Sequence, residues 1–210
     1  MEASVHKAAR RSPRIPRADR ERQLLDIAED LFARHGYEAI SIEDVARQAG
    51  ITRPVVYDHF GSKEGLYLAC VRRARNEFER SLVQAVADDP DPQERLLRGA
   101  DAFFAILERD PRRWAILFGV QAPLQGDFGA ALTELRRVTV ARIAELLAGF
   151  AHDVDPQRLD AYAHAVSGAG EQLGRWWLAH PEVPRAQVSA YLRDFAWQGL
   201  RPFAEAGATS

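Results

Sequence analysis

The chain has 210 residues, 47% of them hydrophobic, which is enough for one or two globular domains with a substantial core. A single cysteine excludes an internal disulfide and a multi-cysteine metal site, and the absence of a long apolar run or signal segment predicts a cytoplasmic protein without a membrane part. The formal net charge of -2 does not by itself indicate a nucleic-acid-binding protein, but residues 1–17 carry five basic side chains and one acidic side chain.

Hydrophobic residues recur at three- and four-residue spacing through most of the chain, which is the period of an amphipathic helix. No segment of useful length alternates strictly between apolar and polar residues, so strands are not expected. The sequence therefore predicts an all-α fold of about nine helices. The expected ranges, caps included, are 17–35, 41–49, 52–60, 63–86, 93–109, 112–120, 128–151, 157–180 and 185–202.

Residues 41–60 contain two short predicted helices joined by a tight turn. Ser41 is an N-cap candidate with an acidic residue three positions later, as in a capping box. Gly50 suits a helix C-terminus because glycine tolerates a left-handed backbone. Thr52 is the next N-cap candidate, and Pro54 falls in the first turn, where its missing N–H breaks no helical bond. This pattern predicts a helix-turn-helix, whose second helix enters the DNA major groove.

Three stretches around these helices match one known family. They read Ile-Ala-Glu-Asp-Leu-Phe-Ala-Arg-His-Gly-Tyr (27–37), Ser-Ile-Glu-Asp-Val-Ala-Arg-Gln-Ala-Gly-Ile (41–51) and Val-Tyr-Asp-His-Phe-Gly-Ser-Lys-Glu-Gly-Leu (56–66). With them, residues 17–68 resemble the N-terminal domain of the TetR family of bacterial transcriptional regulators. The resemblance implies an Ω-shaped homodimer with a DNA-binding head on each subunit and a helical effector domain that holds a ligand cavity.

The first turn of the second short helix is expected to contact DNA. Arg53 could donate two hydrogen bonds to guanine or, equally well, clamp a phosphate. Thr52 could touch DNA but is more simply explained as a cap. Pro54 and Val55, which stand where many family members have small or polar residues, could touch thymine methyl groups, with Val55 partly buried. The other predicted contacts, to phosphates, are Ser41, Tyr57, His59 and Lys63, the last three by the resemblance.

Aromatic residues cluster between 103 and 128 and again on the penultimate predicted helix. Each one alone is best explained by core packing, but together they predict an apolar effector cavity. Gln121, Glu171 and Gln172 are candidate polar anchors. The predicted lining consists of Phe103, Phe104, Leu107, Trp114, Leu117, Phe118, Gln121, Phe128, Glu171 and Trp176.

Three glycines lie inside one predicted helix, where each costs up to ~1 kcal/mol relative to alanine. Close approach of a helix from a second subunit would explain them, and packing within the chain is the alternative. The resemblance favours the first explanation, because it implies a dimer built from the last two helices. The predicted interface residues are Gly168, Gly170, Gly174, Trp177, Leu192 and Phe195.

Enzymes are disfavoured because the sequence lacks a Gly-x-Ser-x-Gly elbow, a P-loop and a Gly-x-Gly-x-x-Gly motif. Asp160 and His164 could share a helix face, but no second such pair supports a metal site. Neither a metal nor a cofactor is therefore expected.

The chain is expected to have three parts: a disordered basic arm (1–16), a DNA-binding domain (17–77) and an effector-binding and dimerisation domain (78–210). The arm could reach into a DNA groove or serve only as a soluble extension. We expect a homodimeric repressor that binds a palindromic operator in double-stranded DNA and is released by a small apolar or aromatic effector. The alternatives are an activator or ligand-independent regulator with the same head, or a helical enzyme or binding module without DNA binding.

Overall fold

The computed structural model describes residues 15–86, 91–118, 126–149 and 154–207. Within these ranges the chain forms nine helices and no strand, which confirms the predicted all-α class. The helices are α1 (Arg17–His35), α2 (Ile42–Gln48), α3 (Arg53–Phe60), α4 (Lys63–Val86), α5 (Pro92–Arg109), α6 (Pro111–Phe118), α7 (Gly126–Ala148), α8 (Pro156–Leu178) and α9 (Arg185–Gly207).

Local chemistry sets most helix ends where the sequence predicts them. The Ser41 hydroxyl accepts a hydrogen bond from the Asp44 N–H at 3.3 Å, and the Asp44 carboxylate accepts one from the Ser41 N–H at 2.9 Å. This is the predicted capping box. Gly50 has a φ of 66° in the turn between α2 and α3, a conformation that glycine adopts without steric cost.

Several boundaries differ from the prediction. The helices α5 and α8 begin at Pro92 and Pro156, one residue early, because preceding aspartates cap them and proline fits the first position. The helix α9 continues beyond the predicted end, with Pro202 inside it, as far as Gly207. The helix α6 is described as far as Phe118 and α7 covers 126–148, while residues 119–125 and 150–153 lie outside the described ranges.

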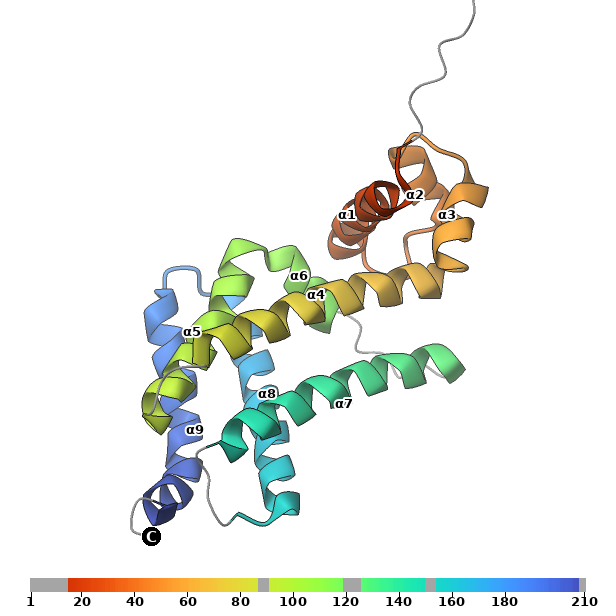
Figure 1. Cartoon of the computed structure of the whole chain (residues 1–210). Helices are drawn as coiled ribbons and strands as arrows, with labels where there is room; N and C mark the ends of the chain where they lie inside the picture. Colours follow the sequence, from red (N-terminus) through yellow and green to blue (C-terminus); the bar gives the residue numbers. More distant parts are fainter. Residues whose placement is uncertain (1–14, 87–90, 119–125, 150–153, 208–210) are drawn as a thin grey trace, which may run out of the picture.

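Helix α4 connects the two parts of the molecule (Figure 1). Its first half packs with α1, α2 and α3 in a common core that includes Leu24, Val45, Val56 and Leu66. Its second half packs against α5 and α7. The domain boundary predicted at residue 77 therefore falls inside an unbroken helix that both parts share.

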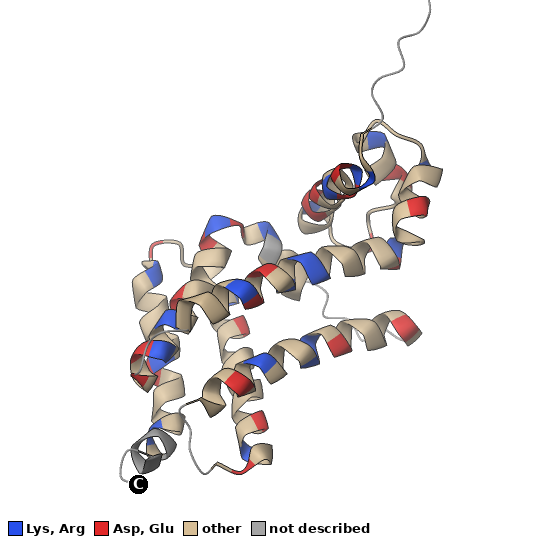
Figure 2. Ribbon diagram, viewed as in Figure 1, with Lys and Arg blue, Asp and Glu red and all other residues tan. Residues whose placement is uncertain are grey.

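The remaining helices form the body at the other end of α4. There α5 packs against α4 and α9, and α8 packs against α7 and α9. The short helix α6 lies between the body and the head and contacts α1, α4 and α5. Basic and acidic residues are interspersed along the ribbons of these helices (Figure 2). No helix in the described ranges is long and apolar enough to cross a membrane.

Candidate functional site

The first turn of α3 is exposed on the surface of the head. Thr52, Arg53, Pro54 and Val55 are all exposed, whereas Val56 is completely buried. Val55 is 36% exposed, which agrees with the expected partial burial. The side chain that anchors the first turn is Val56, which is completely buried.

Thr52 occupies the N-cap position of α3, but its side chain makes no capping hydrogen bond. The cause is Pro54, because a proline at the second helical position has no N–H to offer a cap. The next N–H, of Val55, instead bonds to the backbone oxygen of Thr52 at 3.0 Å. The side-chain cap expected here is thus absent, and the hydroxyl stays on the exposed surface.

Two arginines of the head form ion pairs with carboxylates on its surface. Arg53 Nη1 lies 3.3 Å from Glu43 Oε2, and Arg17 Nη1 lies 3.2 Å from Asp58 Oδ2. Exposed pairs of this kind contribute only about 0–1 kcal/mol, so a phosphate can replace the carboxylate at little cost. Arg17 had been expected only as the first residue of a helix, and the structure places it against α3, where it also donates to the Asp58 carbonyl.

The other predicted phosphate contacts differ in exposure. Tyr57 is 49% exposed. His59 is half-buried against Phe60 rather than outward-facing, and its Nδ1 has no partner among the described residues. Lys63 is also half-buried: its Nζ donates to the Glu38 carbonyl at 3.2 Å and lies 4.3 Å from the centre of the Tyr37 ring.

Ser41 uses its polar groups within the cap. Its hydroxyl and its N–H both donate to Asp44 Oδ2, at 2.6 and 2.9 Å. These hydrogen bonds lower the pKa of the Asp44 carboxyl. A phosphate contact by Ser41 would have to compete with the cap.

A cavity of about 110 Å³ lies in the body between α4, α5, α6, α7, α8 and α9. A single water molecule needs about 10–15 Å³ on the same measure, so the cavity can hold a molecule of many atoms. Most of its wall is aliphatic or aromatic. Representative wall residues are Phe78, Leu82, Phe103, Ile143, Leu146 and Val166.

The predicted lining residues fall into two groups. Phe103, Leu117 and Phe118 line the cavity, and Leu107 and Trp114 line a smaller adjoining space. Phe104 is instead a fully buried core residue. Core packing is therefore the better explanation for Phe104.

Three predicted lining residues lie elsewhere. Phe128 packs 5.1 Å from the Tyr37 ring at the junction of head and body. Trp176 is 39% exposed and stacks on His180, because the neighbouring Trp177 takes the buried side of α8. Glu171 is absent from the wall and pairs with Arg136 and Arg175.

Gln121 lies outside the described residues, and Gln172 is exposed. The polar groups in the wall differ from those predicted. They include four arginines, Arg75, Arg95, Arg136 and Arg193, and no carboxylate among the described wall residues. A signal for Arg75 was present in the sequence, since it shares the helical register of Val71, Phe78 and Leu82 on the apolar face of α4.

Packing within the chain requires glycine at one of the three helical positions. A Cβ on Gly174 would lie 2.6 Å from the Trp114 ring, and one on Gly170 would lie 3.5 Å from Leu192 and 3.7 Å from Phe103. Gly168 has nothing within 4 Å of this position. Gly174 is thus explained by packing within the chain, whereas a methyl group at Gly170 would make only ordinary van der Waals contacts there.

Of the predicted interface side chains, two are buried within the chain and one is exposed. Trp177 and Leu192 are buried in the body core, with Trp177 Nε1 donating to the Val183 carbonyl at 2.7 Å. Phe195 is 63% exposed, and Leu178 and Tyr191 are exposed large apolar side chains on the same two helices. The face of α8 and α9 that remains open contains Gly168 and Phe195 but not the other four predicted residues.

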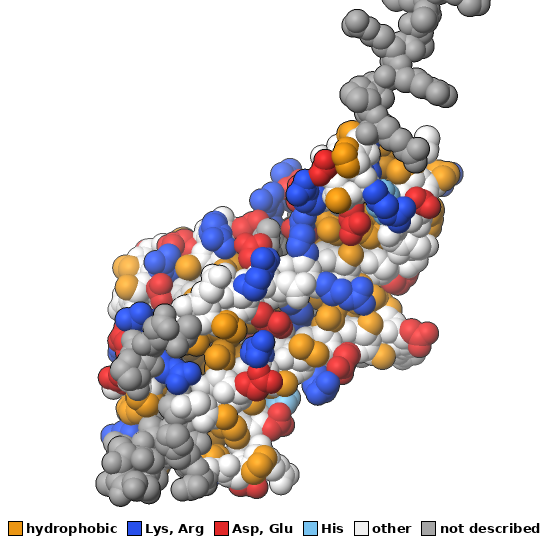
Figure 3. Space-filling model, viewed as in Figure 1, with side chains coloured by type: hydrophobic (Ala, Val, Ile, Leu, Met, Phe, Trp, Pro, Cys, Tyr) orange, Lys and Arg blue, Asp and Glu red, His pale blue; other side chains and the backbone are white. Residues whose placement is uncertain are grey.

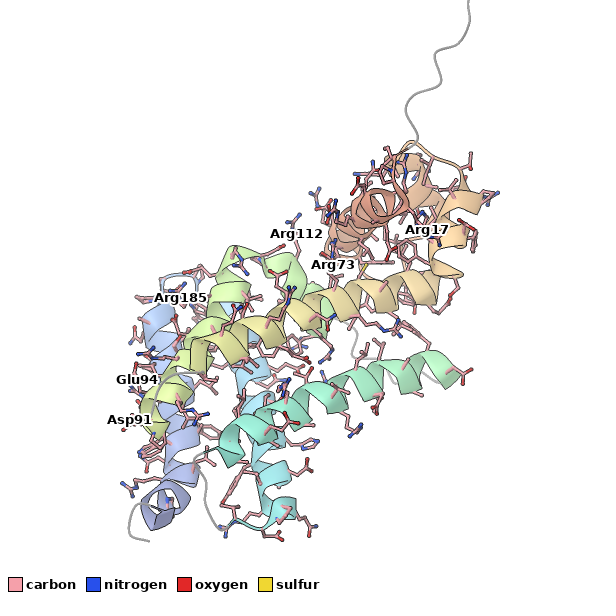
Figure 4. The ribbon with its side chains drawn as sticks, in the orientation of Figure 1. Arg17, Arg73, Asp91, Glu94, Arg112 and Arg185 are labelled. Atoms are coloured by element: carbon pink, nitrogen blue, oxygen red, sulfur yellow. The ribbon has the colours of Figure 1, made fainter. Side chains whose placement is uncertain are left out.

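Helix α6 connects the cavity to the head. Ile116 is buried in the head core, while the next two residues, Leu117 and Phe118, line the cavity. Polar contacts reinforce this junction: Arg112 pairs with Asp30 of α1 at 3.3 Å, and Arg73 of α4 pairs with Asp26 and Glu29 of α1 at 2.7 Å each. Figure 4 shows Arg73 and Arg112 at this boundary.

In the space-filling view, the head lies at the upper right and the larger body at the lower left (Figure 3). On the face shown, basic, acidic and apolar side chains are mixed over the body. The described residues contain no group of three or more His, Cys, Asp or Glu side chains placed to hold a metal. Asp160 and His164 contact each other on the exposed side of α8.

Two family models match this chain. Residues 24–70 match the model described as bacterial regulatory proteins, tetR family, and residues 92–199 match the tetracyclin repressor-like C-terminal domain. Two relatives are the transcriptional activator FasR of Mycolicibacterium smegmatis and the transcriptional regulator AlkX of Mycobacterium tuberculosis. FasR is 27% identical over 91% of this chain and 87% of its own length, and AlkX is 30% identical over 91% and 90%.

Solved structures with the same fold include a TetR-like regulator from Rhodococcus sp. RHA1. It is 32% identical, covers 90% of this chain and 99% of its own, and has a TM-score of 0.70. FadR of Bacillus subtilis in complex with stearoyl-CoA has a TM-score of 0.73 at 14% identity, covering 83% and 96%. AibR in complex with isovaleryl coenzyme A and operator DNA has a TM-score of 0.66 at 23% identity, covering 84% and 97%.

Proposed function

Because this chain belongs to the TetR family of bacterial transcriptional regulators, we propose that it is a repressor that an effector releases from DNA. In this proposal it acts in the cytoplasm as a homodimer on a palindromic operator. Two recognition helices α3, about 34 Å apart, would enter successive major grooves. The exposed first turn of α3, which presents both Arg53 and Val55 to solvent, supports this use of the head.

The observation that carries the proposal is the continuity of α4. The helix begins at Lys63, which contacts the head through Tyr37 and Glu38, and it ends along the cavity with Phe78, Leu82 and Val86. A change in the cavity walls therefore acts on the same rigid element that positions the head. An effector that fits only the form with displaced heads would lower operator affinity by its differential affinity for the two forms.

The effector that we propose has an apolar chain that occupies the body cavity. The aliphatic and aromatic wall supports this. Two proteins of the same fold have been solved with stearoyl-CoA and isovaleryl coenzyme A, which supports an acyl chain as the apolar part.

The proposed homodimer uses the open face of α8 and α9. Phe195, Tyr191 and Leu178 are large apolar side chains exposed in the single chain, and a second copy would cover them. A Phe195→Asp variant should then be a folded monomer with weakened operator binding. Sedimentation measures the state of association, and a Phe195→Leu variant that retains the dimer is the control.

The proposed function is tested by footprinting on the DNA that flanks the gene, followed by gel shifts with and without acyl ligands. We expect protection of a palindrome and a loss of the shifted band as the effector is added. A saturated effector complex that binds the operator as tightly as the free protein would contradict the release mechanism.

A second function, that of an activator, is favoured by one observation. FasR, which matches 91% of this chain, is named a transcriptional activator. In vitro transcription from the footprinted promoter separates the two, because a repressor lowers and an activator raises the amount of transcript.

A further inference from the structure

Arg75 is a buried arginine in the middle of α4 that faces the effector cavity. Its side chain is 6% exposed and forms part of the cavity wall. Nη1 donates to Thr139 Oγ1 on α7 at 2.6 Å, whereas Nε has no hydrogen-bond partner among the described residues. No carboxylate in the described ranges lies within the 4.0 Å of an ion pair with this guanidinium.

Two other arginines of the wall do have ion-pair partners. Arg136 pairs with Glu171 at 3.0 Å and Arg193 with Asp194 at 2.7 Å. Glu79 is linked to Arg75 only through Thr139, whose hydroxyl lies 3.0 Å from the Glu79 carboxylate. The cation of Arg75 is thus buried without a direct counter-charge, while Arg136 adds a like charge nearby and Glu79 and Glu171 add opposite charges beyond ion-pair distance.

A buried charge without a partner is unfavourable, so its presence in a cavity requires an explanation. Burial, followed by repulsion from Arg136, lowers the pKa of Arg75 to about 10, which still leaves it protonated at neutral pH. The bond to Thr139 occupies one nitrogen at the end of the guanidinium. The edge formed by Nε and Nη2 is left, and such an edge can donate two parallel hydrogen bonds to one carboxylate.

We propose that Arg75 binds the carboxylate of the effector, so that the ligand is a free carboxylic acid whose apolar chain fills the rest of the cavity. This inference rests on the proposed function, because it assigns the head group of the same effector. A carboxylate supplies the missing counter-charge and the acceptors for Nε and Nη2. We prefer a carboxylate to a larger anion because Arg75 is only 6% exposed, so that only a small head group can reach its guanidinium.

The acyl-CoA esters bound to two proteins of this fold have no carboxylate at the head of the acyl chain. The thioester carbonyl is neutral, and the negative charges of coenzyme A are on the phosphates of a bulky nucleotide. An acyl-CoA could place its chain in the cavity but would leave Arg75 without an anion. The affinities of the free acid, the neutral amide and the thioester of one chain length therefore show whether Arg75 binds a carboxylate or the cavity binds only the chain.

The test is a calorimetric titration of the full chain with saturated carboxylates from hexanoate to hexadecanoate, with the matching amides, and with the matching coenzyme A thioesters. For the wild type we expect the best carboxylate to bind about tenfold to a hundredfold more tightly than its amide, since a charged hydrogen-bonded pair is lost. Arg75→Met should reduce carboxylate affinity to that of the amide. Arg75→Lys should keep part of the preference.

Two controls separate a binding role from a structural one. Arg80→Met removes an exposed arginine of the same helix, which bonds only to the Asn76 carbonyl among its described contacts, and should leave all affinities unchanged. Thermal unfolding of Arg75→Met should show a midpoint equal to or above that of the wild type, because an apolar side chain of similar length replaces an unpaired buried charge.

The assignment is overturned if acid and amide bind the wild type equally, if no carboxylate of the series binds, if the thioesters bind more tightly than the acids, or if Arg75→Met keeps the preference for the acid. The proposed function has its own readout in the operator gel shift. If thioesters or amides release the operator while the acids do not, the carboxylate assignment fails and the effector-responsive regulator stands. If no ligand that binds alters the gel shift, the proposed function fails and the measured acid preference still decides the role of Arg75.

Discussion

The phenol of Tyr67 on α4 donates a hydrogen bond to the backbone carbonyl of Ile116 on α6, at 3.1 Å. Ile116 lies in the last described turn of α6. Arg175 of α8 satisfies the carbonyl of Phe118 in the same way at 2.7 Å. Side chains from the head–body junction and from the body thus cap the helix that reaches from the cavity to the head.

Tyr67→Phe should lower the free energy of unfolding by about 0.5–1.5 kcal/mol, because it removes a buried hydrogen bond. Burial raises the pKa of Tyr67, so the phenol is a donor at any physiological pH. The variant should also weaken the effect of ligand on operator binding. Denaturant unfolding and gel shifts measure the two effects. Tyr162→Phe, which removes a hydroxyl that accepts from Arg158 at the exposed surface of α8, is the control, and an equal loss in both variants would contradict the role of the Tyr67 hydrogen bond.

Arg53→Ala should reduce operator affinity by about 1–3 kcal/mol if Arg53 reads a guanine, with a loss of discrimination at one base position. If Arg53 clamps a phosphate, affinity should fall equally on all sequences, and the slope of log affinity against log salt should decrease by about 0.9. Binding titrations on the operator and on single-base variants distinguish the two. Arg34→Ala, which breaks an exposed pair with Asp30, is the control, and normal binding by an Arg53→Ala, Tyr57→Ala double variant would exclude this reading head.

Gly174→Ala should destabilise the body by about 1–3 kcal/mol, because the new methyl group would meet the Trp114 ring at 2.6 Å and the core must shift. Gly168→Ala is the matched change on the same helix. It should stabilise a single chain by up to about 1 kcal/mol, since alanine is the better helix former and the space is open. Chemical unfolding below the dimerisation concentration compares them, and a Gly174→Ala protein as stable as the wild type would contradict the packing assigned to Trp114.

The capping box of α2 should make the stability of the head depend on acid pH. Hydrogen bonds from Ser41 lower the pKa of Asp44 in the folded protein, so the folded state favours the carboxylate. The stabilisation is complete above the unfolded pKa of about 3.9 and is lost as the pH falls through the lower folded value. Asp44→Asn should remove this part of the pH dependence. Thermal unfolding between about pH 2 and pH 6 gives the comparison, and identical pH profiles would refute it.

The sequence by itself determined the elements whose causes are local. Helical period, the Ser41–Asp44 cap and the glycine in the α2–α3 turn act within a few residues, so the helices of the described ranges and the helix-turn-helix could be predicted. The missing Thr52 cap was also decided locally, by Pro54, although the pattern of cap residues alone did not indicate it.

The tertiary structure decided which helix faces meet. Trp176 and Trp177 are adjacent and chemically alike, but only the packing of α8 on α5 and α9 puts one in the core and the other on the surface. Gly174 is explained by Trp114, sixty positions away, and Phe128 by two tyrosines of the head. The unpaired charge of Arg75 likewise exists only once six helices close around it, because burial and the absence of a counter-charge are properties of the packed molecule.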